Sequence, residues 1–324
     1  MPGEEQEAVP PFSLDADRWE DTFAGRLKHI VDVFDPVKLL LSDDEVDASM
    51  QLLDDFKAGK RAPGVTDTQL WEARNVKEAL IHPDTDEALP RLFSFAAYTP
   101  MQPPILVGLC WPNAGIATVL FWQWANQSFN TCVNYCNRNA AGGLDDQTLA
   151  MSYGVAVTMG CGLAVGMGKL STKLKNPMVK LLAPFVSVAA AGCGSLVVIR
   201  HKELETGVPV YDHEKVERGY SVKAAQAGIS ACCVTRVAWN IPNLLVPPFI
   251  MAALEPVVFA TNPILRLPFF TVLGTVCCFC GIYPAQALFS QNATITPADI
   301  EPEFQGLLDS QGRPVDTFRY NKGL

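Results

Sequence analysis

The central part of the chain contains apolar segments long enough to cross a lipid bilayer, and these constrain the fold more than any other feature. A membrane-spanning helix needs ~20 mostly apolar residues. Five segments meet this length, although Trp111, Pro112 and Asn113 interrupt the first one. We therefore predict an all-α, polytopic membrane protein with five transmembrane helices, at about residues 103–124, 149–168, 178–199, 227–254 and 267–289.

Charged residues lie mainly outside these segments and define the flanking regions. Most of the acidic residues behind the net charge of −9 are near the two ends of the chain. Ser42 and Glu45 match a capping box, which predicts a helix that ends at Gly59, and a second helix is expected over residues 66–80. We accordingly divide the chain into a soluble N-terminal helical region (1–98), a transmembrane domain (99–290) and a C-terminal tail (291–324).

The cysteines and the missing motifs exclude several function classes. Eight of the ten cysteines sit inside apolar runs with no histidine near them, so they are interpreted as small hydrophobic residues of helix walls. A metal site in the CCFC run at 277–280 is the alternative. No basic patch is interleaved with aromatic residues, which argues against nucleic-acid binding. The serine-hydrolase, P-loop, dinucleotide and zinc-protease motifs are absent, so the sequence predicts no enzyme, no cofactor and no metal.

One arginine, Arg236, lies within the fourth apolar segment. A permanent cation near the middle of a bilayer costs at least ~2.5–3.5 kcal/mol on insertion scales, so it should face a partner or a watery cavity. No Asp or Glu lies in any other predicted span, and Asn240 and Asn243 follow on the same helical face. We interpret Arg236 as a clamp for the carboxylate of a solute. An internal partner, either a loop acid or a backbone carbonyl, is the alternative.

A stripe of mostly amide side chains follows the first span. At about 100° per residue, its members fall within an arc of about 120°; they are Gln123, Asn126, Gln127, Asn130, Asn134, Asn137 and Arg138. Amides offer donors and acceptors without charge, which suits a zwitterionic solute. Hydrogen bonding between helices and an amphipathic helix at the membrane surface are the alternatives. The candidate substrate-binding residues are Arg236, Asn126, Gln127, Asn130, Asn134 and Asn240.

Prolines and glycines modify the predicted spans. Pro242, Pro247 and Pro248 all fall in the fourth segment, so we expect a broken, cavity-lining helix in which these prolines act as hinges. Gly162 and Gly166 form a small-xxx-small pair in the second span, which is typical of close packing between membrane helices.

A short motif, His82-Pro83-Asp84-Thr85, precedes the membrane domain, and Asp84 with Glu87 could form a capping box or simply a turn. With four further motifs it identifies the chain as similar to the sideroflexins along almost its whole length. These motifs are FAGRLKHIVDVFDPVKLLL near the start, LFWQWANQSFNTCVNYCNR, which contains Ser128, VTR…PPFIM around Arg236, and the terminal NKGL.

The resemblance implies a five-span protein of the mitochondrial inner membrane that is imported without a cleaved presequence. It also implies transport of serine or similar small neutral amino acids into the matrix, in support of one-carbon metabolism. The basic residues of the loops nearly balance, so the matrix location of the N-terminal region is implied by the resemblance alone. A carrier of citrate or an iron-related solute, and a non-transporting scaffold for inner-membrane complexes, are the alternatives. Expected partners are the amino acid, the bilayer and inner-membrane proteins or a second copy.

The sequence departs from the family pattern at one position. The family commonly continues HPDT with Gly-Glu, whereas here Asp86 stands before Glu87. This substitution adds a charge and removes backbone freedom from the turn.

Overall fold

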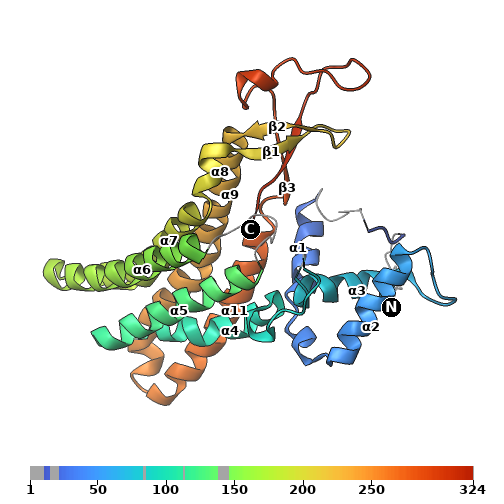
Figure 1. The fold of residues 1–324 in the computed structure, drawn as a ribbon. Coiled ribbons are helices and arrows are strands. Elements are labelled where there is room, and N and C mark those ends of the chain that lie inside the picture. Colours follow the sequence, from blue (N-terminus) through green and yellow to red (C-terminus); the bar gives the residue numbers. More distant parts are fainter. Residues whose placement is uncertain (1–10, 15–21, 83–84, 112–113, 138–145, 324) are drawn as a thin grey trace, which may run out of the picture.

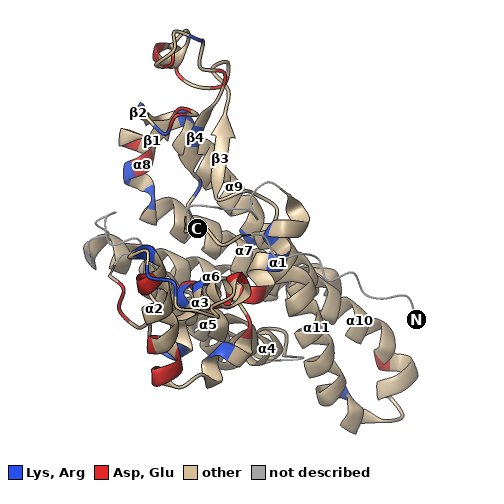
Figure 2. Cartoon of the chain, turned by 90° about the vertical axis from the view of Figure 1, so that its right-hand side faces the viewer, with Lys and Arg blue, Asp and Glu red and all other residues tan. Residues whose placement is uncertain are grey.

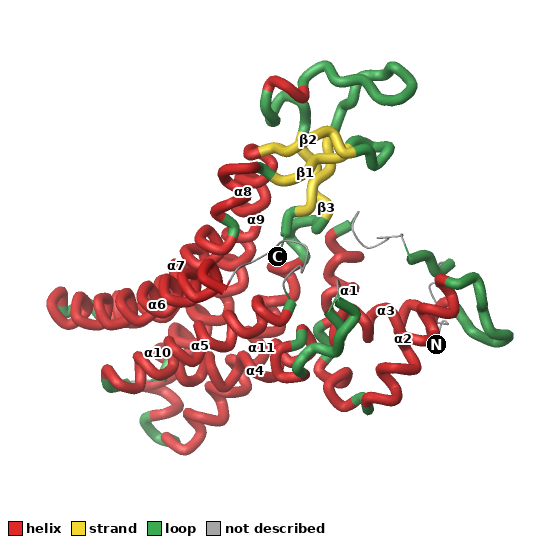
Figure 3. The backbone as a smooth tube through the Cα atoms, viewed as in Figure 1, coloured by secondary structure: helices red, strands yellow, loops and turns green. Residues whose placement is uncertain are grey.

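The computed structural model describes residues 11–14, 22–82, 85–111, 114–137 and 146–323. Most of these residues are helical, and a small sheet lies at one end of the helices (Figure 3). Charged residues are concentrated on the N-terminal helices and around the sheet (Figure 2).

The N-terminal region is helical, as predicted. It contains α1 (Phe23–Val33), a 3-10 turn η1 (Pro36–Leu40), α2 (Asp43–Lys57) and α3 (Asp67–Leu80). The capping box at Ser42 is confirmed, because the Ser42 side chain accepts from the Glu45 amide and the Glu45 carboxylate accepts from the Ser42 amide. Thr66 and Gln69 cap α3 in the same way. Buried Leu70 and Trp71 pack α3 against α2.

The predicted first span is wrong, because two helices occupy its place. Helix α4 (Phe95–Leu109) and helix α5 (Ile116–Cys136) form an antiparallel hairpin. Near one end of this hairpin Asn137 donates to the Phe93 carbonyl, and near the other end the Trp122 ring lies directly over Gly108. Pro100, Pro103 and Pro104 lie inside α4, and the amides of α5 lower its hydropathy.

Four helical stretches in the part of the chain that the structure describes are long and apolar enough to span a membrane, so the predicted count of five is not confirmed. They are residues Gln147–Leu174, Pro177–Ile199, Val222–Phe259 and Pro263–Gln286. The first two correspond to α6 (Asp146–Leu174) and α7 (Pro177–Ile199), which pair as a hairpin (Figure 1). Among the described residues, no atom beyond the backbone of α6 itself lies within 4 Å of where a Cβ of Gly162 or Gly166 would be, so these glycines do not form a contact with another helix of this chain.

The third stretch contains four prolines and stays helical throughout, so the expected break is not found. Helix α9 (Val222–Asn240) continues into a π-helical turn η4 (Ile241–Leu245), then α10 (Val246–Leu254) and a second π turn η5 (Glu255–Phe259). Pro242 lies in the first π turn, and Pro247 and Pro248 begin α10. The wider π turns accommodate the missing proline N–H groups without ending the helix. A short turn η6 (Pro263–Leu265) leads into α11 (Arg266–Gln286).

The prediction of an all-α fold is corrected by a four-stranded antiparallel sheet. After α8 (His201–Thr206), β1 (Val208–Tyr211) and β2 (Glu217–Ser221) form a hairpin before α9. The C-terminal tail contributes β3 (Asn292–Ile295), the turn η7 (Pro302–Phe304) and β4 (Phe318–Asn321), and the strand order is β2-β1-β4-β3. Buried Val210 and Phe318 belong to the core beneath these strands. Strands this short give little sequence signal beside long apolar helices.

The sheet and the N-terminal region meet the same end of the helix bundle. The sheet connects the end of α7, the start of α9 and the chain that leaves α11. Arg26 on α1 donates to the carbonyl of Ala287, immediately after α11, at 2.8 Å, and Phe34 packs edge-on against Tyr283.

Candidate functional site

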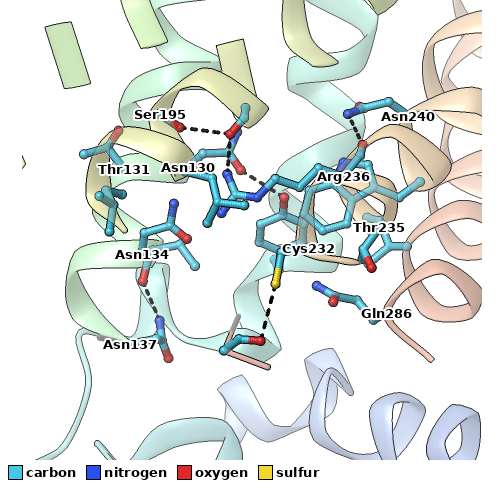
Figure 4. A pocket seen from close by; sticks show the side chains of 18 of the residues that line it. Asn130, Thr131, Asn134, Asn137, Ser195, Cys232, Thr235, Arg236, Asn240 and Gln286 are labelled. Atoms are coloured by element: carbon cyan, nitrogen blue, oxygen red, sulfur yellow. Dashed lines mark hydrogen bonds between the residues drawn. The ribbon is translucent and has the colours of Figure 1, made fainter. Parts of the chain in front are cut away.

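A cavity of about 380 Å³ lies between the α4–α5 hairpin, α7, α9 and α11. Its inner part is lined by amides, hydroxyls and one guanidinium group, and Figure 4 shows several of these side chains converging from different helices. Its end toward the sheet is lined by Arg200, Glu203, Lys322 and Gly323. Polar groups inside a helix bundle are characteristic of a path for a polar solute.

Arg236 extends from α9 across this cavity toward α7 (Figure 4). One of its terminal nitrogens, Nη1, donates to the Gly192 carbonyl at 3.0 Å. Gly192 has no side chain, so the arginine packs directly against the α7 backbone: a Cβ there would lie 3.8 Å from the Arg236 Cδ. Within the described residues no carboxylate lies close enough to pair with Arg236. A neutral carbonyl leaves the positive charge uncompensated, so the guanidinium group can still bind an anion.

Three polar residues form a chain of hydrogen bonds on the α4–α5 side. The Tyr98 hydroxyl donates to Oδ1 of Asn130 at 2.9 Å, and the Asn130 amide donates to the Asn126 backbone carbonyl at 2.8 Å and to its side-chain oxygen at 3.2 Å. Asn126 is buried, and its own NH₂ group has no partner among the described residues. A buried donor without a partner costs ~1–3 kcal/mol, which a bound solute would recover.

All six predicted substrate-binding residues line this cavity: Arg236, Asn126, Gln127, Asn130, Asn134 and Asn240. Their surroundings differ. Asn240 donates back to the Arg236 carbonyl of its own helix at 2.7 Å. Gln123 and Gln127 lie against Gly160 of α6, and the Ser128 hydroxyl bonds to Tyr153 of α6 at 2.9 Å. Part of the polar stripe therefore faces the cavity, and part of it forms hydrogen bonds to neighbouring elements, as Asn130 does with Tyr98 and Asn137 does with the Phe93 carbonyl.

The HPDT motif lies apart from the cavity, at the end of α3. Pro83 and Asp84 are outside the described residues, and His82 and Thr85 sit in a tight turn. The His82 amide donates to the Glu87 carbonyl at 2.8 Å, and the Thr85 amide donates to Nδ1 of His82 at 3.3 Å. Glu87 lies beside an extended bridge between Ile81 and Ala88, so residues 85–89 do not form the helix that a capping box would begin. Asp84, the cap of that predicted box, lies outside the described residues.

Asp86 has a φ of 53°, in the left-handed region that favours glycine. Its carboxylate pairs with the Lys77 ammonium at 2.6 Å, and this hydrogen bond lowers the pKa of Asp86. The departure from the family pattern thus replaces glycine at a position with glycine-like backbone geometry.

The residues at the sheet end of the cavity were missed by the sequence analysis. Arg200 is buried; its Nε and Nη2 bond to Glu203 at 2.9 and 2.5 Å, and its Nη1 donates to the Lys322 carbonyl at 2.7 Å. Arg200 was counted as a loop charge because it follows the third span directly. Lys322 is 122 positions away in sequence, and only the terminal NKGL motif could have drawn attention to it.

Comparisons with known proteins agree on one family. A family profile described as Sideroflexins matches residues 13–324. Sideroflexin-5 of Rattus norvegicus is 37% identical over 98% of this chain and 93% of the relative. Sideroflexin-3 of Mus musculus is 36% identical over 97% and 98%, and Sideroflexin-1 of Homo sapiens is 32% identical over 98% and 99%. No solved structure matches the chain.

Proposed function

The chain belongs to the sideroflexin family, and on that basis we propose that it carries serine, or a similar small neutral amino acid, across the mitochondrial inner membrane into the matrix. Family membership supports a carrier-like role, and the four apolar helical stretches supply a membrane domain. The observation that carries the proposal is Arg236, a cation inside the bundle that faces a polar cavity and whose hydrogen-bond partner among the described residues is a neutral carbonyl.

The chemistry of the cavity fits a zwitterion. Arg236 would bind the carboxylate through the guanidinium edge that Gly192 leaves unused. The amides of Asn126, Asn130 and Asn134 would meet the hydroxyl and ammonium groups. The volume, about 380 Å³, is near the lower end of the ~300–1,000 Å³ range of ligand pockets, which suits a small solute with some water.

A carrier must change between outward-open and inward-open states, and the π turn after Asn240 is the part of the helix that we propose bends. A π turn within an α-helix has weaker local hydrogen bonding and often marks a functional site. Pro242 lies in this turn, and Pro247 and Pro248 follow it. We place the hinge between outward-open and inward-open states here.

Two observations bear on the alternatives. Arg200 and Lys322 line the cavity as well as Arg236, so an anionic cargo such as citrate, which needs several cations, gains support. Arg200 already bonds to Glu203 and the Lys322 carbonyl, which leaves Arg236 as the better-placed anion ligand.

A scaffold that used the polar stripe to bind a partner protein is disfavoured, because Asn126 and Gln127 are buried.

The test is uptake into proteoliposomes, with labelled serine, alanine and citrate as separate substrates. Arg236→Ala should lower serine uptake at least ~10-fold, because a hydrogen-bonded charge pair worth ~1.5–3 kcal/mol is lost. Arg266→Ala is the matched control, since Arg266 pairs with Glu255 at 3.2 Å and does not line the cavity. This control should transport like the wild type.

Serine uptake by Arg236→Ala at the wild-type rate would dismiss the carboxylate clamp. Citrate uptake that exceeds serine uptake would instead identify the cargo as a multivalent anion. Loss of a co-purifying complex without any change in transport would favour the scaffold.

A further inference from the structure

The last described residues of the chain, Asn321–Gly323, form a segment that we name the C-terminal strap. It continues from β4, and its Lys322 and Gly323 line the sheet end of the cavity together with Arg200, Glu203 and Cys232. The strap therefore lies where a solute would enter or leave on this side.

The strap is held by buried hydrogen bonds. Its Lys322 carbonyl accepts from Nη1 of Arg200 at 2.7 Å, and the Lys322 amide donates to the Gln291 carbonyl at 2.8 Å. The Cys232 thiol on α9 lies 3.7 Å from the Lys322 carbonyl oxygen and 3.6 Å from that of Gly323. Arg200 thus connects the end of α7 to the end of the chain through a charged donor, which makes a stronger bond than a neutral one.

Two glycines allow this close fit. A Cβ at Gly228 on α9 would lie 3.0 Å from the Lys322 carbonyl oxygen. Gly323 has a φ of 78°, and a Cβ there would lie 2.8 Å from Nη1 of Arg200. A larger residue at position 323 would force the strap and the Arg200 guanidinium group apart, by displacing one or the other.

We propose that the C-terminal strap is a seal over the sheet end of the cavity, latched by Arg200, and that it must move before a solute can pass. This extends the proposed function, because a seal matters only where the cavity is a transport path. Opening the seal breaks the Arg200 bond, the backbone bond between Lys322 and Gln291, and the weak contacts with the Cys232 thiol. None of these is a backbone bond within a helix, so the strap can move without unfolding α7 or α9.

The experiment measures how fast a charged, membrane-impermeant maleimide labels Cys232 in the full-length protein in nanodiscs, where both faces are open to the reagent. Cys232 is only 3% exposed and faces the strap, so its labelling rate is compared with that of the same protein after denaturation, when every cysteine is open to the reagent. Labelling of each cysteine is read by peptide mass spectrometry.

Gly323→Ala should raise the Cys232 labelling rate at least ~10-fold, because it breaks a hydrogen bond to a charged group. Gly312→Ala is the matched control: its φ of 76° carries the same backbone cost, but nothing lies within 4 Å of the added Cβ. Its labelling rate should equal that of the wild type. Arg200→Gln is a second variant that weakens the latch without changing the strap, and it should also expose Cys232.

Wild-type labelling rates in folded Gly323→Ala and Arg200→Gln proteins would overturn the seal, and so would an equal increase in Gly312→Ala. Folding is checked by size-exclusion elution. The labelling of Cys232 does not depend on which solute is carried. The experiment can therefore reject the seal without rejecting the serine carrier, and the reverse. Increased labelling together with no serine transport keeps the seal and rejects the serine carrier, whereas serine transport with unchanged labelling does the reverse.

Discussion

At the scale of single residues, Asp86 shows how a local conflict can be tolerated. A non-glycine residue in the left-handed region costs ~1–2 kcal/mol, somewhat less for Asp than for most residues. The ion pair with Lys77 lies at the surface, where such pairs contribute ~0–1 kcal/mol. The pair therefore offsets only part of the strain in the turn that follows His82.

Asp86→Gly should leave the N-terminal region as stable or stabilise it by up to ~1 kcal/mol, because the strain disappears. Asp86→Ala should destabilise it by ~1 kcal/mol, since the strain remains and the ion pair is lost. Because Lys77 lowers the pKa of Asp86, the ion pair contributes above the pKa of the unfolded carboxyl group and is lost as the pH falls through the lowered one. The advantage of glycine should therefore grow in acid. Thermal unfolding at two pH values measures this, and equal stability of the Gly and Ala variants would refute it.

Arg236 and the amide stripe could be found from sequence, because a cation or a run of amides in an apolar segment stands out against its neighbours. The groups that these residues contact could not be found from the sequence. The Gly192 carbonyl is a backbone group on another helix, and it leaves no mark on the pattern of side chains. Arg200 is similar: its environment is created by the C-terminal strap, which only the folded chain brings near.

At the scale of elements, the contact between α11 and the π turn limits the size of the side chain that α11 can have at position 281. A Cβ on Gly281 would lie 2.7 Å from the Trp239 carbonyl oxygen, from Cγ of Pro242 and from Oδ1 of Asn243. The carbonyl and the proline ring are fixed by the helix, so none of these atoms can easily move aside. The π turn and α11 are therefore packed at backbone distance.

Gly281→Ala should destabilise the protein by ~1–3 kcal/mol through overpacking and should also lower serine uptake, because the proposed hinge is displaced. Gly162→Ala should be neutral or stabilising by up to ~1 kcal/mol, since the new methyl group meets open space and alanine favours the helix. Thermal unfolding in one detergent compares the two. Gly281→Ala with wild-type stability would show that this contact is looser than described.

Helix capping in the N-terminal region was predictable because Ser42 and Glu45 act within one turn. The predictions that were wrong concern how elements pack against one another, which local sequence does not determine. The 103–124 segment is apolar enough for one span, yet α4 and α5 fold back on each other and pair Tyr98 with Asn130. The prolines of the fourth segment predicted a break, but Pro242 lies in a π turn and Pro247 and Pro248 lie in the first turn of α10, so the helix continues. The sheet joins strands that are about a hundred residues apart, a distance that local periodicity does not sense.

At the scale of the whole molecule, the N-terminal region and the sheet should lie on the same side of the membrane. Both meet the end of α11 at which Ala287 accepts from Arg26. One protease site inserted after Gly64 and the same site inserted after Gly312 should be cut together in sealed vesicles of uniform orientation, because both positions lie in open turns. Cleavage from opposite faces would contradict this arrangement.

In the part of the chain that the structure describes, Arg236 pairs with a carbonyl and not with a carboxylate, and this has an energetic consequence for the whole molecule. A zwitterion adds no net charge to the guanidinium group, so the loaded and empty forms differ little in charge. Moving one elementary charge across a potential of 100 mV changes its free energy by ~2.3 kcal/mol. A cargo without net charge would carry no such electrical energy, whichever way it crosses the membrane. The flux would then follow the concentration difference of the amino acid and would not depend on the membrane potential.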